Sequence, residues 1–344
     1  MKANLKLNYE KLCKYLKFHD KQYNIFLPNE IFEDLKQIKN VQHRAFAYSY
    51  IYLITWLWRY SKYGDLEYSQ LSQKKIKETL GRKSDERINY LIKKDGVLEQ
   101  MKWIESVKDF PIFNQSEGEK YYIERLDKEI WNINVELTFV SEMKGEDVWK
   151  YVRPPARFTA KKPVRAYTRY PNDPEMEEDY NSGYCDGTFE SIENTHSVPF
   201  QVFLYSMTNR NVGTKGFYIY SYLYFKNKLF RDGYDVTVPN LATQLKVAQS
   251  TVQEWLDIVR RYCMVEVKHN QTHFVVGMRK EDRKASTYIT NNFTSFTTKP
   301  VKYNKMPVMK RSQYFALLKE QQEEIDRKQK EKRGIDIPLD QLPF

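Results

Sequence analysis

The pattern of hydrophobic positions changes its period three times between residues 217 and 278, and it predicts the clearest set of elements in the chain. In the first part, hydrophobic residues recur at i, i+4, i+7 and i+11, namely at Tyr218, Tyr222, Phe225 and Leu229. This spacing is typical of one face of a core-facing helix. The sequence Arg231-Asp232-Gly233 ends the pattern, so we expect the helix to stop there.

Two shorter helices and a hairpin are predicted to follow. Leu241 and Leu245 lie one helical turn apart, and a third helix is indicated by Val252, Trp255, Leu256 and Val259. Only a tight turn fits between these helices. After Tyr262 the period falls to two, because Val265 and Val267 alternate with charged residues. A return strand with the same alternation is predicted at Phe274, Val276 and Met278.

This order of helix, helix, turn, helix and hairpin is that of a winged helix-turn-helix, whose third helix commonly lies in the major groove of DNA. The segment LATQLKVAQSTVQEWL (241–256) resembles DNA-binding helix-turn-helix sequences, above all at its Gln249-Ser250-Thr251-Val252 start. The alternative is a three-helix domain with a solvated polar turn. Because Ala248 stands where a capping Ser or Thr is usual, a capping box of Ser250 and Gln253 would start the helix later.

Two groups of side chains in this unit are candidates for contact with DNA. Short polar side chains on the first exposed turn of the third helix reach base edges and phosphates without obstruction. The candidates for reading or positioning DNA are Gln249, Ser250, Thr251 and Gln253. The candidates for holding the phosphate backbone are Lys246 and, on the wing, Lys268, His269 and Gln271.

A second copy of the pattern lies earlier in the chain. A helix is predicted over residues 43–60, with one face formed by Tyr50, Leu53, Ile54 and Leu57. Shorter helices at Ile76–Leu80 and Ile88–Ile92 follow, then strands over residues 97–104 and 120–125. A shift of 165 positions superposes Leu80 on Leu245 and Leu91 on Leu256. This internal duplication predicts two winged-helix units.

The turn of the first unit carries both basic and acidic residues. Ser84 is placed to cap the third helix, and Asp85 and Glu86 would interact favourably with the helix dipole. The same acids would face phosphates unfavourably. The candidates for DNA contact here are Arg82, Lys83, Ser84 and Arg87. The alternative role for this helix is packing or dimerisation.

Composition and pattern together predict an α+β protein that is mainly helical, with two winged helix-turn-helix domains. The linker between them is basic and then acidic, and its basic half contains three internal prolines that exclude a regular helix. That half either follows a phosphate backbone or is a solvated linker. The predicted parts are an N-terminal extension (1–40), the first domain (41–150), the linker (151–200), the second domain (201–279), and a basic tract, polar helix and tail (280–344).

The last residues, GIDIPLDQLPF, resemble the C-terminal tip of bacterial single-stranded DNA-binding protein. In that family, acids precede a terminal Leu/Ile-Pro-Phe that genome-maintenance proteins recognise. The resemblance implies that a host replication factor binds a flexible tail through Asp336, Asp340, Leu342, Pro343 and Phe344. This tip departs from the family in having two acids only and a glutamine at position 341.

The overall charge favours a polyanionic partner. Lys and Arg number 56 against 45 acidic residues, which gives a net charge of +11. The three cysteines show no paired spacing, so a reducing compartment is expected. No segment approaches the length of a membrane span, and we expect a cytoplasmic protein without a membrane partner.

Motifs for catalysis are not found. The phosphate-binding G-x-x-x-x-G-K-[ST] loop is missing, and so is the His-x-His motif of rolling-circle nicking enzymes. His269 and His273 have no third ligand near them in the sequence. We therefore expect a binding protein that uses no metal or other cofactor.

Two winged-helix units, basic tracts and a recruiting tail together resemble the plasmid and phage replication initiators built from tandem winged helices. The resemblance implies binding of double-stranded DNA at repeated origin sequences, with homodimeric and monomeric forms, and recruitment of host replication proteins. The alternatives are a winged-helix transcriptional regulator and a primosome or helicase-loading component.

Overall fold

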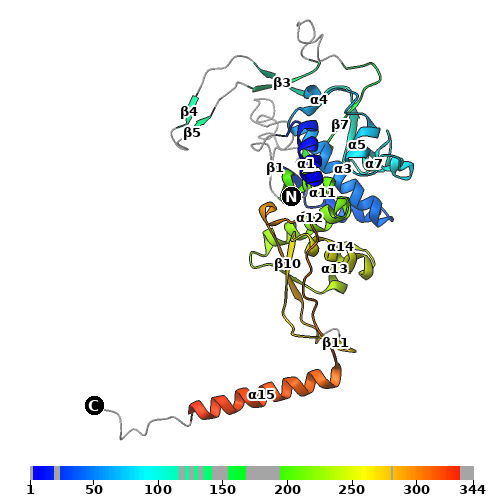
Figure 1. The fold of residues 1–344 in the computed structure, drawn as a ribbon. Helices are drawn as coiled ribbons and strands as arrows, with labels where there is room; N and C mark the ends of the chain where they lie inside the picture. The colour runs from blue at the N-terminus through cyan, green and yellow to red at the C-terminus, as the bar shows by residue number, and fades with distance from the viewer. Residues whose placement is uncertain are drawn as a thin grey trace.

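The computed structural model describes residues 3–18, 24–115, 121–123, 128–130, 135–141, 154–167, 194–279 and 282–333. Over these residues the chain combines helices with sheets of two or three strands (Figure 1). This is the mixed α+β composition that the sequence predicts. No described helix is both long enough and apolar enough to cross a membrane.

The first forty residues contain regular elements. They are α1 (Ala3–Tyr15), β1 (Asn24–Pro28), α2 (Ile31–Asp34) and the 3-10 helix η1 (Leu35–Gln37). Strand β1 pairs antiparallel with β8 (Thr195–Pro199), and Ile25 lies opposite Val198. The last part of the predicted linker is therefore a strand that joins the N-terminal region to the second half of the chain.

Helix α3 (Val41–Arg59) confirms the helix predicted over residues 43–60. Asn40 begins it, because its side chain accepts hydrogen bonds from the backbone amides of Gln42 and His43. Every residue from Arg44 to Trp58 is buried, so the helix is covered on all sides and not on one face only.

Helix α12 (Gly213–Leu229) packs against α3, and α11 (Phe200–Thr208) packs against α12. Aromatic rings fill the contact between α3 and α12. The ring of Phe217 lies 4.9 Å from that of Tyr52 and 5.6 Å from that of Tyr48, measured between centroids. Apart from Val275 and Met278, which form a small second cluster with Tyr314, the buried hydrophobic side chains of the two predicted units consequently belong to one continuous core.

The helices of the first unit that follow α3 are short. They are α4 (Lys62–Asp65), α5 (Gln73–Thr79), the 3-10 helix η2 (Glu86–Ile88), α6 (Asn89–Ile92) and α7 (Val97–Gln100). The predicted third helix is thus divided into two single turns. The strand predicted over residues 97–104 is wrong, because the Gln100 amide bonds back to the Gly96 carbonyl and closes a helical turn, and the strand of this region begins only at Glu105.

The strands of the first unit pair differently from the prediction. The pairs are β2 (Glu105–Val107) with β7 (Ala160–Lys162), β3 (Pro111–Gln115) with β6 (Val135–Phe139), and β4 (Tyr121–Ile123) with β5 (Lys128–Ile130). The strand predicted over residues 120–125 exists as β4 but is not the partner of β2. That partner is β7, which lies in the predicted linker and is followed by α9 (Val164–Tyr167).

The second unit contains the predicted helices in the predicted order. After α12 come β9 (Tyr234–Val236), α13 (Val238–Leu245), α14 (Gln249–Arg261), β10 (Val265–His269) and β12 (Ser286–Thr290). The three strands form one antiparallel sheet in the order β10-β12-β9. The sheet thus continues beyond residue 279, where the sequence pattern placed the end of this unit.

The predicted return strand of the second hairpin is wrong. Residues Phe274–Val276 form β11, which pairs in parallel with β13 (Val308–Lys310), while β10 pairs with β12. The sequence pattern predicts that Phe274 and Val276 face the core, but these side chains are 50% and 55% exposed, and Val275 between them is buried.

The chain after β12 passes through the 3-10 helix η4 (Phe293–Ser295) and β13 into α15 (Arg311–Arg333). Helix α15 confirms the polar helix predicted near the C-terminus, and it points away from the rest of the chain (Figure 1). The tail residues Asp336, Asp340, Leu342, Pro343 and Phe344 lie outside the described residues.

A buried arginine connects α3 to the end of α13. Arg44 Nη1 donates to the carbonyl oxygens of Leu245 at 2.5 Å and Lys246 at 3.3 Å. Arg44 Nη2 donates to the carbonyl of Ile38 at 3.0 Å. The last carbonyls of a helix have no partner within the helix, so this guanidinium satisfies groups that burial would otherwise leave unpaired.

The sheet between β1 and β8 places a neutral histidine in the core. His196 Nε2 lies 2.8 Å from the Tyr48 hydroxyl and His196 Nδ1 lies 3.0 Å from Asn29 Oδ1. Burial, together with a smaller contribution from the positive charge of Lys228, lowers the pKa of His196 from 6.5 to about 3.

We predict that this histidine makes stability depend on pH between about 6.5 and 3. The unfolded chain takes up a proton near pH 6.5 and the folded chain only near pH 3, so acid favours unfolding in that window. The free energy of unfolding should fall by about 1.4 kcal/mol per pH unit from this group. Urea unfolding at pH 6.5 and 5.0 should show that His196→Gln loses about 1.6 kcal/mol less than the wild-type chain. Equal losses in both chains would contradict the assignment.

Candidate nucleic-acid interface

Helices α13 and α14 meet at a tight turn whose conformation is set by Lys246. Thr237 begins α13 by accepting a hydrogen bond from the Asn240 amide at 3.3 Å. Lys246 ends α13 in the left-handed region at φ 52°. Ala248 precedes α14 without a side-chain cap, so the capping box of Ser250 and Gln253 does not form and the helix begins at Gln249.

One face of α14 is buried and the opposite face is exposed at its beginning. The buried face consists of Val252, Trp255, Leu256 and Val259, as the sequence predicts. Lys246, Gln249, Ser250 and Gln253 are exposed, and Thr251 is half-buried. The structure therefore brings the predicted reading residues together at the first turns of one uninterrupted helix.

A groove of about 660 Å³ lies between the exposed face of α14 and the sheet of β10 and β12. Gln249, Gln253 and Arg260 line it from α14, His269 lines it from β10, and Lys284 lies on the segment leading to β12. Residues 303–308 form part of the opposite wall. The groove combines amide side chains, which recognise base edges, with cations, which bind phosphates, and two acids, Glu254 and Asp257, also line it.

The C-terminal half of α14 is covered by the segment after β12. The guanidinium of Arg260 lies over the ring of Tyr303 at 3.8 Å, and the Tyr303 hydroxyl donates to Asp257 Oδ1 at 2.5 Å. The Val301 amide donates to the carbonyl of Arg261 at 2.7 Å. These contacts leave the first two turns of α14 as its accessible part.

The wing residues named from the sequence differ in exposure, charge and hydrogen bonding. Lys268 is exposed on β10. His269 is exposed as a whole residue, but partial burial of its imidazole and the positive charge of Arg260 lower its pKa. It therefore carries no charge near neutral pH. Gln271 is only 8% exposed, and its amide donates to the His273 carbonyl and accepts from the Lys284 amide. Gln271 thus holds the loop together, and we leave it out of the interface.

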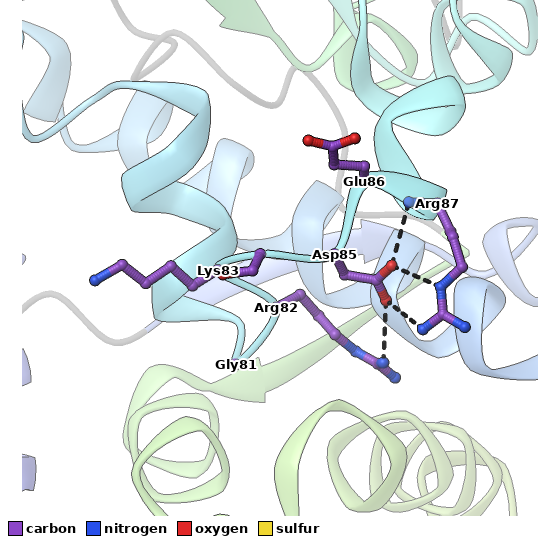
Figure 2. Close-up of a pocket in the computed structure, with 7 residues that line it drawn as sticks. Gly81, Arg82, Lys83, Asp85, Glu86 and Arg87 are labelled. Atoms are coloured by element: carbon purple, nitrogen blue, oxygen red, sulfur yellow. Dashed lines mark hydrogen bonds and ion pairs between the residues drawn. The ribbon is translucent and has the colours of Figure 1, made fainter.

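The turn of the first unit places its cations beside acids (Figure 2). The Asp85 carboxylate lies 2.9 Å from Arg87 Nε and 3.4 Å from Arg82 Nη1. Lys83 Nζ lies 3.2 Å from Glu78. These ion pairs lower the pKa values of both carboxyls and reduce the positive charge available for a phosphate.

Capping in this turn also differs from the prediction. Asp85, not Ser84, begins the short helix, because its carboxylate accepts the Arg87 amide at 3.2 Å. Ser84 is exposed on the turn. The acid that was expected to sit inside the helix is therefore its cap, and its side chain also fixes the two arginines.

Two cations of the basic linker are likewise paired. Lys161 Nζ lies 2.6 Å from Glu99 Oε1, and Arg165 Nη2 lies 3.0 Å from Asp34 Oδ2. Both acids belong to elements that precede the linker. Lys161 connects the linker to the first unit and Arg165 connects it to the N-terminal extension, so both are less available to follow a phosphate backbone than the sequence alone indicates.

The sequence pattern missed the groove itself. Arg260 and Tyr303 both line it and stack on each other, and they lie more than forty positions apart in the sequence. In the sequence, the only local sign of this groove is the pair Arg260-Arg261 at the end of the helical pattern. Within the part of the chain that the structure describes, no cluster of three or more His, Cys, Asp or Glu residues is placed to hold a metal ion.

Comparisons with protein-family models, curated proteins and solved structures gave no match to this chain. The case for any function therefore depends on the residues and geometry described above.

We predict that Lys246→Gly stabilises the fold by about 0.5 to 1 kcal/mol, because glycine adopts the left-handed conformation without the steric cost of a Cβ. The backbone carbonyl that binds Arg44 is unchanged by this substitution. Urea unfolding measures the effect, and Lys246→Ala is the matched control because it removes the same charge but keeps the Cβ. Equal stabilities of the two variants would contradict this origin of the strain.

Proposed function

We propose that residues 213–290 form a winged helix that binds double-stranded DNA. The observation that carries the proposal is the order α12-β9-α13-α14-β10-β11-β12 together with the sheet order β10-β12-β9. A winged helix joins a helical bundle to such a hairpin, and its third helix enters the major groove. In this proposal α14 is the reading helix and the segment between β10 and β12 is the wing.

The exposed side chains of α14 suit the reading of base edges. Glutamine amides can bond both N6 and N7 of adenine, which makes Gln249 and Gln253 the residues proposed for sequence recognition. Ser250 and Thr251 are close enough to the helix start to contact phosphates together with its free backbone amides. Lys246 and Lys268 would add contacts that depend on salt and not on sequence.

The first unit is a weaker candidate for reading DNA. Its third helix consists of the turns η2 and α6, whereas α14 is continuous over 13 residues. Arg82 and Arg87 share one carboxylate, so approach of a phosphate would have to displace existing ion pairs. We assign the first unit a supporting role through the core that α3 shares with α12.

Among proteins that bind specific DNA sites, we propose a replication initiator of a plasmid or phage. The sequence supports this choice through the repeated unit, the basic tracts and the tail that resembles a recruiting tip. A transcriptional regulator would use α14 in the same way but would not need that tail. A primosome component would favour forked DNA over a fixed site. The proposed activity is recognition and recruitment without catalysis.

The direct test is selection of bound fragments from the DNA that encodes this protein, mixed with host genomic DNA, at physiological salt. The initiator should enrich a cluster of short repeats beside its own gene. With these repeats on a plasmid, a chain that lacks residues 342–344 should still bind them but fail to support replication. Enrichment at scattered promoters would favour the regulator, and tight binding to forks without sequence preference would favour the primosome role.

The reading role of α14 is tested with the selected duplex and a random duplex of equal length. Gln249→Ala and Gln253→Ala should each lower affinity for the selected duplex about tenfold and change random binding little, because a lost base contact costs about 1 to 3 kcal/mol. Arg87→Ala in the first unit is the control and should change neither affinity. Equal losses on both duplexes would argue against base reading.

A further inference from the structure

A cavity of about 350 Å³ lies in the first unit, between the beginning of α5, the residues that follow α6, and the segment that leads into β7. Helices α3 and α4 and strand β2 also contribute to its wall. The cavity shares no lining residue with the groove beside α14. Its volume is within the range of sites that bind small molecules, which is about 300 to 1,000 Å³.

Part of the cavity wall is apolar and aromatic. Leu71, Ile76 and Ile92 are buried side chains that line it. The half-buried ring of Phe158 also lines it, and this ring is held by the ring of Tyr68, with 4.6 Å between their centroids. An aromatic ring fixed beside a pocket provides a surface on which a nucleobase can stack.

Tyr50 supplies a hydroxyl group that has no partner. Tyr50 is 1% exposed and lines the cavity from α3, but its hydroxyl makes no hydrogen bond to any residue that the structure describes. The nearby Tyr63 hydroxyl, in contrast, donates to the carbonyl of Lys161 at 3.1 Å. Burial raises the pKa of Tyr50 well above its usual value of 10, so the hydroxyl keeps its proton and can donate. Buried hydroxyls are normally hydrogen-bonded, and this one is therefore available to a ligand.

Three cations at the cavity also have no partner. Lys93, Lys94 and Arg157 line it and are exposed, and they form no ion pair within the part of the chain that the structure describes. We call these three residues the cationic rim. Lys161 also lines the cavity, but its ammonium is held by Glu99 at 2.6 Å. Because none of the described lining residues is acidic, the cavity attracts an anion.

We propose that this cavity binds a nucleotide. The base would stack on Phe158 beside the apolar wall, the phosphate would bind the cationic rim, and Tyr50 would donate to an acceptor atom of the base or sugar. An inorganic anion would leave the apolar wall without a contact, and an apolar ligand would leave the hydroxyl and the cations unpaired. A nucleotide provides the ring, the acceptors and the phosphate in one molecule. The proposal does not depend on DNA binding by α14.

The first test is calorimetric titration of the full chain with deoxyadenosine 5′-monophosphate. The wild-type chain should bind one molecule per chain. Deoxyadenosine and inorganic phosphate should each bind at least about tenfold more weakly, because each retains only part of the contacts. The proposal is overturned if the nucleotide shows no saturable binding, or if inorganic phosphate binds as tightly as the nucleotide.

The second test uses variants of the lining residues. Tyr50→Phe removes only the hydroxyl, so it should weaken nucleotide binding about fivefold. The same variant should leave the urea-unfolding curve of the free chain unchanged, because no hydrogen bond within the chain is lost. Equal nucleotide affinity of Tyr50→Phe and the wild-type chain would contradict the role of this hydroxyl and overturn the proposal.

The cationic rim is tested by Lys94→Gln combined with Arg157→Gln, which should weaken nucleotide binding at least about tenfold. The matched control is Lys39→Gln combined with Arg231→Gln, which removes a lysine and an arginine that are exposed outside the cavity. The control should bind the nucleotide as the wild-type chain does. Equal weakening by the two pairs would indicate general attraction by the charge of the chain and would overturn the site.

A free nucleotide and the 5′-phosphorylated end of a DNA strand supply the same chemistry, and competition distinguishes them. Tighter binding of a 5′-phosphorylated single-stranded oligodeoxyadenylate than of the mononucleotide would support a strand end as the ligand, and the reverse order would support the free nucleotide. In both cases Tyr50→Phe should weaken the tighter ligand. A closed duplex without strand ends should not displace the mononucleotide, and displacement would overturn the proposal by placing the nucleotide on a general DNA-binding surface.

Discussion

The guanidinium of Arg44 connects the core of the first unit to the turn of the proposed reading unit. It lies on a helix that is buried on all sides, and it donates to the last carbonyls of α13. A positive charge at a helix C-terminus is favourable, and burial strengthens its hydrogen bonds. Without it, the buried carbonyl of Leu245 would lose this hydrogen-bond partner. The direction in which α14 leaves the turn therefore depends on a residue of the first unit.

The two units are also joined through one hydrophobic core. Helix α12 belongs by sequence to the second unit, but its aromatic residues pack on Tyr48 and Tyr52 of α3. A reading helix must be held within a fraction of an ångström to match base edges, and a rigid support serves that need better than a mobile linker. In the proposed function, the first unit supplies this support, while its own turn is neutralised by Asp85 and Glu78.

The helices could be predicted from the sequence because their signal is local. Helices α3, α12 and α14 each carry hydrophobic residues at helical spacing, and tight turns separate α13 from α14. The strand partners could not be predicted in the same way. Strand β12 reads Ser-Thr-Tyr-Ile-Thr and buries Tyr288 alone, whereas the more hydrophobic β11 turns Phe274 and Val276 outward. Hydrophobicity therefore pointed to the wrong return strand.

The candidate interface was predictable only where it follows one helix. Gln249, Ser250 and Gln253 share an exposed surface because they occupy consecutive turns of α14. Gln271 looked equally polar in the sequence, but the loop uses its side chain for internal hydrogen bonds. The role of Arg44 had no local signal, since its acceptor carbonyl on Leu245 lies 201 positions away. Contacts of this kind appear only when the chain is folded.

Amide hydrogen exchange of the full chain, with and without a bound duplex, tests most directly which unit meets DNA. If α14 and the wing form the interface, binding should slow exchange in residues 246–254 and in β10 and β12, and leave residues 81–92 unchanged. Slower exchange in residues 81–92, with none in residues 246–254, would contradict the account and assign the interface to the first unit.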